Sequence, residues 1–199
     1  EYKLAIKYFQ EALELIKQNK DDELFQNQPT LLSNLGLVYT NLEQHNKAIE
    51  YYNKSLDFKD LQSSNPVLYA NILDNLATSK LLKGDYLNVL NLFQESFKIR
   101  LKQKNDSGII ISCVHISQYY EKIKDFENAS KYAEKAVEIT KKYKNPYDVL
   151  VAYKQAAKVI KENTIKYSED YLRISDSLKV EEKKNEDRFA RIELETEEI

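Results

Sequence analysis

The sequence predicts an all-α fold, an α-α superhelix (solenoid) of antiparallel helix pairs that ends in a long C-terminal helix. The first observation is a pattern that returns at intervals of 43, 41 and 40 residues, in which a small residue is followed four positions on by an apolar, usually bulky one. The second is a composition with 31% charged residues and only three glycines and three prolines, which suits long helices. The third is that no strand-like alternation competes with the pattern. The four copies are Ala5/Phe9/Ala12/Leu13, Ala48/Tyr52/Ser55/Leu56, Val89/Phe93/Ser96/Phe97 and Ala129/Ala133/Ala136/Val137.

Each copy marks the second helix of a pair, and the array is expected to occupy residues 1–178. The chain is expected to begin inside such a second helix, as a fragment whose first-helix partner is missing. Four further repeats are then expected to begin near residues 29, 66, 107 and 146.

Prolines and short polar segments indicate where these helices begin and end. Pro66 and Pro146 each follow an asparagine, an arrangement suited to an N-cap and the first position of a helix. Pro29 is expected to open a first helix in the same way. Polar turns between paired helices are expected at residues 44–46, 83–85 and 124–125.

Residues 179–199 are expected to form a charged C-terminal helix. Residues 169–199 carry 11 acidic and 6 basic side chains, so they cannot form a core alone. Phe189 lies eleven residues after Leu178, close to three helical turns, so one narrow apolar stripe can continue along a single helix. The residues of this stripe are Tyr171, Ile174, Leu178, Phe189, Ile192, Thr196 and Ile199. The helix is either a coiled-coil linker or a solubilising cap of the array.

The residues upstream of each copy indicate the type of repeat. In the second repeat Leu32, Leu35, Gly36 and Tyr39 place large, large, small and aromatic residues at positions 4, 7, 8 and 11 of a unit that begins at Pro29. This pattern resembles the tetratricopeptide repeat (TPR), in which small residues at positions 8 and 20 let two antiparallel helices approach closely. The period exceeds the usual value of about 34, which implies about two extra helical turns per repeat. Such long-period variants are similar to those of kinesin light chains and of bacterial regulatory and sensor proteins.

The resemblance implies that a protein or peptide ligand binds in a concave groove lined by the first helix of each repeat. Matched position by position, the groove residues are Ser33, Asn34, Leu37, Asn71, Asp74, Asn75, Thr78, Val114, His115, Gln118, Lys122, Tyr153 and Lys154. The side-chain amides of Asn34, Asn75 and Gln118 can pair with an extended backbone. Asparagine is also common at this position whatever the repeat binds, which is the alternative explanation. Asp74 would repel a carboxylate and Lys154 is the one well-placed cation, so a clamp for a terminal carboxylate is not expected.

The sequence carries no signature of an enzyme, a metal site or a nucleic-acid-binding protein. It has no glycine-rich phosphate loop or nucleophile motif, and its two histidines and one cysteine match no zinc spacing. His45 takes an aromatic position and Cys113 a large apolar position of their repeats, so both are expected to pack, whereas His115 is expected to face the groove. A net charge of -2, with lysines interleaved among acids, gives no basic face. We therefore expect no catalytic residue, cofactor or metal here.

The C-terminal residues carry a second resemblance. The segments YLRISDSL (171–178) and RFARIELETEEI (188–199) look like the exit segment of membrane-anchored bacterial regulators. In that family an extracytoplasmic TPR array leads to a transmembrane span and then to a histidine kinase or helix-turn-helix output domain. The resemblance implies a non-catalytic, extracytoplasmic (periplasmic) sensor domain of a bacterial signal-transduction protein, which dimerises through its C-terminal helix. The membrane would be reached only through segments outside this chain.

Two alternatives remain for the parent protein. One is a soluble cytoplasmic TPR scaffold or peptide-responsive regulator, and the other is a histidine kinase of which this chain is the non-catalytic sensor.

Overall fold

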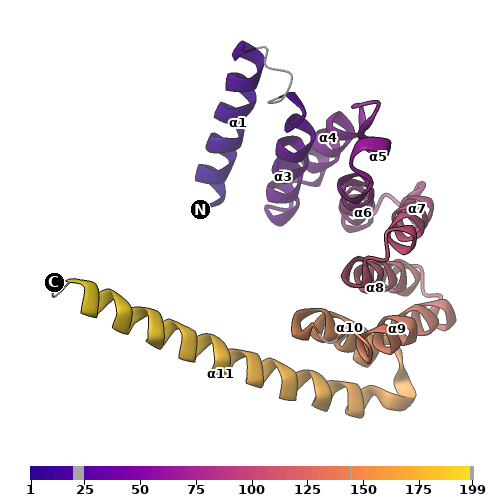
Figure 1. Ribbon diagram of the computed structural model, residues 1–199. Coiled ribbons are helices and arrows are strands. Elements are labelled where there is room, and N and C mark those ends of the chain that lie inside the picture. Colours follow the sequence, from indigo (N-terminus) through magenta and orange to yellow (C-terminus); the bar gives the residue numbers. More distant parts are fainter. Residues whose placement is uncertain (20–24, 144, 198–199) are drawn as a thin grey trace.

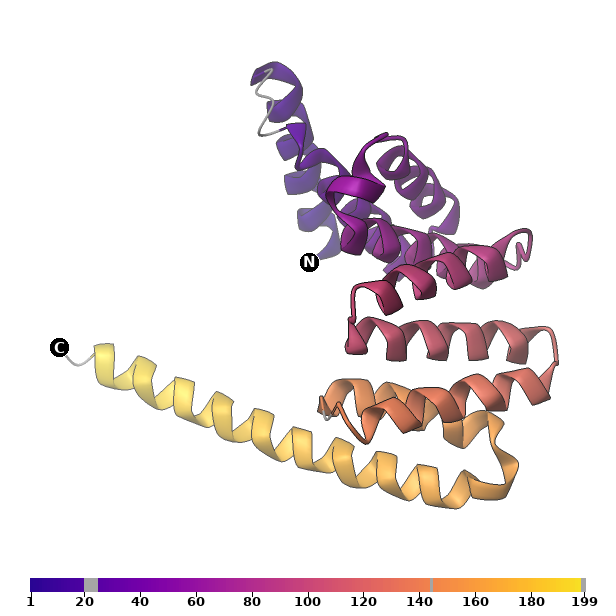
Figure 2. The same ribbon diagram turned by 45° about the vertical axis from the view of Figure 1, so that its right-hand side comes forward.

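The computed structural model describes residues 1–19, 25–143 and 145–197, and every regular element in these ranges is a helix. The helices follow one another along a curve, and the last one projects away from it (Figures 1 and 2). In chain order they are α1 (Tyr2–Asn19), α3 (Gln28–Asn41), α4 (His45–Leu56), α5 (Leu61–Ser64), α6 (Pro66–Lys83), α7 (Val89–Lys102), α8 (Asp106–Lys122), α9 (Phe126–Thr140), α10 (Pro146–Val159), the short 3-10 helix η1 (Lys161–Asn163) and α11 (Thr164–Glu197).

Consecutive helices pack as pairs, and the pairs stack. The pairs are α3 with α4, α6 with α7, α8 with α9, and α10 with α11. Between pairs the second helix packs on the next first helix, as α4 does on α6, α7 on α8 and α9 on α10. Helix α1 lies against α3 in the same way and so occupies the place of a second helix. The predicted all-α solenoid is confirmed.

Asparagine caps begin several helices. The side chain of Asn65 accepts a hydrogen bond from the backbone N–H of Leu68 at 3.0 Å, at the start of α6. Asn145 accepts one from the N–H of Tyr147 at 3.0 Å, at the start of α10. Pro66 and Pro146 follow these caps, and Pro29 lies in the first turn of α3, so all three prolines open helices as predicted.

The turns inside three of the pairs contain residues in the left-handed region. They are Glu43 between α3 and α4, Gly84 and Asn88 between α6 and α7, and Lys124 between α8 and α9, with φ of 57°, 83°, 62° and 64°. The turn expected at residues 44–46 lies slightly earlier, because α4 already begins at His45.

The extra length of the repeat is not all helical. Helices α6 and α8 have 18 and 17 residues, against 14 in α3 and in α10. The connection from α4 to α6 contains the short helix α5 (Leu61–Ser64), whose Leu61 is buried. The expectation of two additional turns in the paired helices was therefore too simple, because part of the length serves as a packed connection.

Small residues let the helices of a pair approach closely. Ala48, Val89 and Ala129, the first residues of three pattern copies, are fully buried. A Cβ atom added to Gly36 would lie 2.5 Å from Cε1 of Tyr52, so the tyrosine ring occupies the space that a side chain on α3 would need. The resemblance-based role of Gly36 as a site of close approach agrees with this geometry.

Two buried serines tie second helices to first helices. The Ser55 hydroxyl on α4 donates to the carbonyl oxygen of Pro29 at 2.7 Å, and the Ser96 hydroxyl on α7 donates to that of Ala70 at 2.8 Å. Both bonds join residues that are 26 positions apart, so the same latch recurs in two consecutive pairs. In the next pair the corresponding residue is Ala136, which is fully buried.

Helix α11 is continuous over 34 residues and outgrows its partner α10. Tyr171, Ile174 and Leu178 are half-buried, and the Tyr147 hydroxyl donates to the Glu182 carboxylate at 3.3 Å, where α10 begins. Beyond this point Phe189 is 68% exposed. The division expected at residue 179 is thus a change in surface character within one helix. The stripe residues Ile192, Thr196 and Ile199 lie outside the described side chains.

In the described part of the chain no helix combines the length and apolar character needed to cross a membrane.

Substitution of Gly36 tests the proposed contact between α3 and α4. Gly36→Leu should lower the free energy of unfolding by several kcal/mol, since overpacking of a filled interior typically costs about 1–3 kcal/mol and here a ring blocks even the Cβ. Urea denaturation measures the effect. In a Tyr52→Ala background the same substitution should cost clearly less, because the obstructing ring is absent. An equal cost in both backgrounds would contradict the contact.

Candidate functional site

The first helices of the pairs line the inner side of the curve, which we call the concave face. In Figure 1 helices α3, α6, α8 and α10 lie inside α4, α7 and α9. Equivalent positions on these four helices are occupied by Asn34, Asn75, His115 and Lys154. Asn34, Asn75 and His115 are half-buried and Lys154 is exposed, so each pair contributes one polar side chain at corresponding places.

Most of the residues expected on the concave face keep some exposed surface. Leu37, Lys122 and Lys154 are exposed, and the half-buried residues are Asn34, Asn71, Asn75, Thr78, His115, Gln118 and Tyr153. Tyr153 makes an edge-to-face contact with Tyr167 of α11, with ring centroids 5.6 Å apart, so much of its surface belongs to the contact between α10 and α11.

The structure corrects the expectation for Ser33, Asp74 and Val114. These residues occupy the same position in α3, α6 and α8 and are only 6%, 1% and 0% exposed. Val114 belongs to the apolar core around α8, α9 and α10. One residue corresponds to about 100° of rotation around a helix, which turns this position away from solvent while the next residue stays at the surface. A bound partner therefore cannot contact Val114, and Asp74 has another role.

Asp74 is the centre of a buried polar cluster that joins α6, α7 and α8. Its Oδ1 accepts a hydrogen bond from Nη1 of Arg100 at 3.2 Å, and its Oδ2 lies 2.6 Å from Nδ1 of His115. Arg100 also donates to Ser112 Oγ at 2.8 Å and to Asn71 Oδ1 at 2.9 Å. We call these five residues the Asp74 cluster.

The guanidinium of Arg100 holds the cluster in place. Arg100 is 6% exposed, and its guanidinium reaches the Gly108 carbonyl oxygen at 3.1 Å in addition to its side-chain partners. A Cβ on Gly108 would come within 2.9 Å of the Arg100 side chain, so glycine makes room for the guanidinium stem. The ion pair itself lies within one repeat, between α6 and α7, and the hydrogen bonds from Arg100 to Gly108 and Ser112 connect it to α8 of the next repeat.

Sequence reasoning did not find Arg100, although a signal exists. Val89, Phe93, Ser96 and Arg100 follow one another at intervals of four, three and four residues, and all four are buried. An arginine on this stripe predicts a buried partner of opposite charge, because an unpaired buried charge is costly. Asp74 on the neighbouring first helix is that partner.

The cluster keeps Asp74 ionised. Burial raises the pKa of its carboxyl group, but the charges and hydrogen bonds of His115 and Arg100 outweigh burial and hold the pKa below the ordinary value of 3.8. The sequence argument against a carboxylate ligand had two grounds, repulsion by Asp74 and the presence of Lys154 as the one well-placed cation. The first ground is wrong, because the Asp74 carboxylate is buried and paired with Arg100.

A second polar group joins α8 to α10. Buried Gln155 donates from Nε2 to Ser117 Oγ at 3.1 Å and to Glu121 Oε2 at 3.2 Å. The other carboxylate oxygen of Glu121 pairs with Lys158 at 2.7 Å. Since Ser117 also donates to the Ala129 carbonyl oxygen, three helices meet at its hydroxyl.

The other residues that could act as nucleophiles or metal ligands lie apart from one another. Cys113 is fully buried, as expected, and burial raises its pKa to about 11, so the thiol stays protonated at neutral pH. His45 is half-buried at the first position of α4. Among the described residues no three side chains of the kinds that ligate metals come together.

Comparison with known proteins identifies the repeat. Residues 1–60 and 27–102 match a family model described as tetratricopeptide repeat, and residues 110–143 match a second model of the same description. The chain belongs to the tetratricopeptide repeat family. TPR repeats generally bind protein or peptide partners and are generally non-catalytic.

Two solved structures have the same overall fold. The apo form of RapI superposes with a TM-score of 0.73 at 20% identity, over 90% of this chain and 66% of the RapI chain. BtubC (BKLC) from P. vanneervenii superposes with a TM-score of 0.72 at 17% identity, over 89% of this chain and 74% of that chain. The TPR chain thus spans slightly less than two thirds of RapI.

The pKa of Asp74 predicts a specific loss of stability in acid. Because its folded pKa lies below the ordinary 3.8, ionised Asp74 stabilises the fold above about pH 4, and this contribution is lost as the pH falls through the folded pKa. Urea denaturation between pH 5 and pH 3 should show unfolding free energy falling more steeply in the wild type than in Asp74→Asn, by at most about 1.4 kcal/mol per pH unit. Parallel curves would contradict this role of Asp74.

Proposed function

We propose that this TPR chain binds an extended peptide, or an extended segment of a protein, on its concave face. The observation that carries the proposal is the succession of half-buried side-chain amides and hydroxyls on successive first helices, namely those of Asn34, Asn75, Thr78 and Gln118. An amide offers both donors and an acceptor, so it can pair with peptide N–H and C=O groups. Binding of this kind depends mainly on the ligand backbone and places modest demands on its sequence.

The charges on the concave face favour an acidic group on the ligand near α8 and α10. Lys122 on α8 and Lys154 on α10 are exposed. The Asp74 carboxylate is compensated by Arg100 and lies below the surface, so it does not cancel these cations. We therefore propose a peptide whose acidic end lies at this part of the face.

Substitution on the concave face tests the binding. A library of random linear peptides, selected against the immobilised chain, should yield peptides whose affinity falls roughly tenfold or more in Asn75→Ala/Gln118→Ala, because two hydrogen bonds of about 1 kcal/mol each are lost. Fluorescence anisotropy measures the affinity. His115 is left unchanged, since its removal would take away the hydrogen-bond partner of Asp74 Oδ2.

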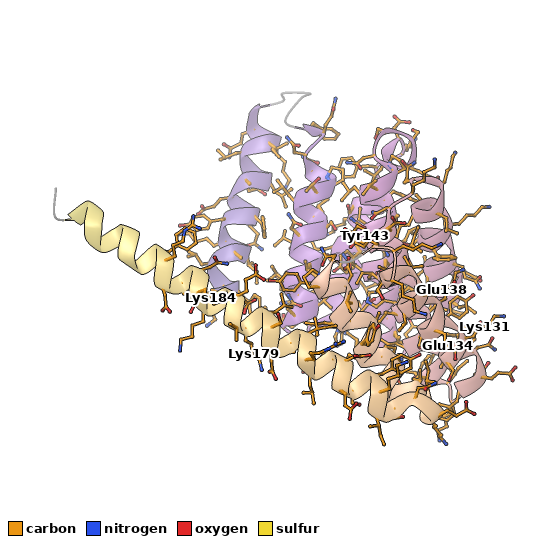
Figure 3. All side chains as sticks on the ribbon, turned by 60° about the horizontal axis from the view of Figure 1, so that its bottom comes forward. Lys131, Glu134, Glu138, Tyr143, Lys179 and Lys184 are labelled. Carbon is orange, nitrogen blue, oxygen red and sulfur yellow. The ribbon has the colours of Figure 1, made fainter. Side chains whose placement is uncertain are left out.

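A matched control lies on the opposite side of the molecule. Lys131 and Glu134 are exposed on the outer helix α9 (Figure 3). Lys131→Ala/Glu134→Ala should leave peptide affinity unchanged. If the two double variants bind the selected peptides equally well, the concave face is not the binding site.

The finer proposal is that this domain is the sensory or dimerising part of a bacterial signalling protein, extracytoplasmic in its parent. It is supported by the continuity of α11 beyond α10 and by the placing of its apolar residues. Phe189 follows Tyr171 by 18 residues, or five full helical turns, so it lies on the stripe that packs against α10. Because α10 begins opposite Glu182, this stripe is uncovered at Phe189, which suits pairing with a second copy of α11.

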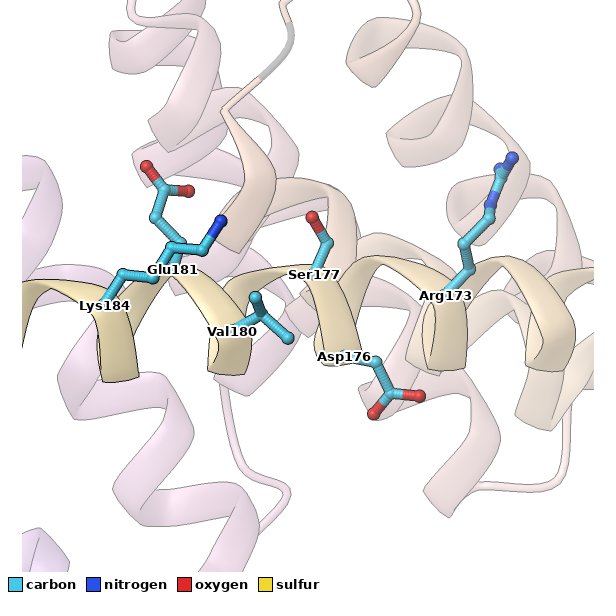
Figure 4. A pocket seen from close by; sticks show the side chains of 6 residues that line it. All are labelled: Arg173, Asp176, Ser177, Val180, Glu181 and Lys184. Atoms are coloured by element: carbon cyan, nitrogen blue, oxygen red, sulfur yellow. The ribbon is translucent and has the colours of Figure 1, made fainter.

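Another face of α11 serves as an internal comparison. Arg173, Asp176, Ser177, Val180, Glu181 and Lys184 line a shallow open hollow of about 690 Å³ (Figure 4). Val180 is 56% exposed, and nine residues of helix place it opposite Phe189. Its neighbours are mostly charged, so this face resembles ordinary solvated helix surface.

In the alternative proposal the protein is a soluble cytoplasmic scaffold. The projecting helix then caps the array, and the chain stays monomeric.

Light scattering tests dimerisation through α11. The chain should be a dimer, and Phe189→Lys should make it monomeric, because the substitution places a charge on the uncovered stripe. Val180→Lys, on the opposite face, should remain dimeric. A version that ends at Lys184, which keeps the part of α11 packed on α10, should also be monomeric. A monomeric wild type at the same concentrations would favour the scaffold.

A further inference from the structure

His115 is the point at which the buried Asp74 cluster reaches the concave face. Its side chain is 21% exposed, whereas that of Asp74 is 2% exposed. The Phe93 ring lies against the imidazole with centroids 5.7 Å apart and planes inclined at 41°. The packed ring and the bond from Nδ1 to Asp74 together fix the orientation of the imidazole.

We propose that Asp74 holds His115 in the tautomer that carries hydrogen on Nδ1. The lone pair of Nε2 then lies on the concave face, where it accepts a hydrogen bond from a main-chain N–H of a bound peptide. The second half of this inference rests on the function proposed above. The first half concerns the free protein and can be tested without a ligand.

The tautomer follows from the hydrogen-bonding capacities of the cluster. Arg100 can only donate, and it engages Oδ1 of Asp74. The ionised carboxylate can only accept, so at Oδ2 the proton must come from Nδ1 of His115, 2.6 Å away. In the neutral imidazole a proton on Nδ1 leaves Nε2 without one.

The ligand group follows from what surrounds Nε2. The structure gives Nε2 no hydrogen-bond partner within the described residues. In the Asp74 cluster the charged side chains Arg100 and Asp74 are engaged with each other, and the exposed cations assigned to the concave face are Lys122 on α8 and Lys154 on α10. Both lysines donate and would repel a cationic ligand group, so the neutral N–H of a peptide bond suits this acceptor.

Nuclear magnetic resonance of the wild-type chain decides the first half. The sequence has only two histidines, so a long-range proton–nitrogen correlation spectrum contains two ring systems, and His45→Gln assigns them. The spectrum is recorded where both rings are neutral, shown by shifts that no longer change with pH. We expect hydrogen on Nδ1 of His115. Hydrogen on Nε2 would overturn the proposal.

Asp74→Asn tests whether Asp74 sets the tautomer. Arg100 should hold the amide oxygen of the new side chain, which turns its NH₂ group towards Nδ1 of His115. The ring should then carry hydrogen on Nε2 and present a donor on the concave face. An unchanged tautomer in a folded Asp74→Asn variant would overturn the role of Asp74. If that variant does not fold, the wild-type spectrum alone decides the tautomer.

Backbone N-methylation tests the contact with a ligand. In a peptide selected from the random library, methylation of the amide that faces His115 should weaken binding to wild type about fivefold, the equivalent of one hydrogen bond. The same methylation should have no effect in His115→Ala. If no position shows this difference, the ligand contact is wrong while the tautomer stands. If the library yields no binder, the proposed function fails and the spectrum still tests the tautomer.

Discussion

The close approach of two helices within each pair is the constraint on which the rest of the array depends. A single helix as short as α3 or α4 is only marginally stable by itself and depends on packing against a partner. Helices α3 and α4 meet where Gly36 leaves space for the Tyr52 ring. The Thr40 hydroxyl lies 3.2 Å from the Tyr52 hydroxyl and 2.8 Å from that of Ser79 on α6. The contact that closes one pair therefore also sets the position of the next. Curvature of the whole array follows from such local contacts.

The buried ion pair between Asp74 and Arg100 acts on geometry more than on net stability. Replacing a buried ion pair by well-packed apolar residues is often neutral, but removing one partner leaves an uncompensated charge. The planar guanidinium here has partners on α6 and α8, so any sliding between the two repeats would break several directed bonds at once. His115 belongs to the same cluster, which makes its orientation a property of two repeats together.

The fold was largely predictable because the buried residues recur at regular intervals in the sequence. The intervals of three and four residues around Ala48, Val89 and Ala129 report which stripe is buried, and asparagine before proline marks where helices begin. The boundaries of connections were less predictable, since α5 is packed by Leu61 through contacts distant in sequence.

The sequence predicted which helices line the concave face, but it did not predict which of their residues are buried. Asn75 and Gln118 keep exposed surface as the family pattern implies, whereas Val114 and Ser33 are buried. The function of Asp74 could not be read from its own helix, because its partners Arg100 and His115 lie 26 and 41 residues away. The position of a residue in the repeat predicts which side of its helix it lies on. Its exposed fraction depends on the helices that pack against that side.

Burial of the single cysteine has a practical consequence for the dynamics of the array. Cys113 is enclosed within the core that α8, α9 and α10 share, and its raised pKa of about 11 leaves little thiolate at neutral pH. A thiol reagent can therefore reach it only when these helices separate. The modification rate in native conditions reports the free energy of that local opening. Comparison with the free energy of global unfolding would show how independently neighbouring repeats open.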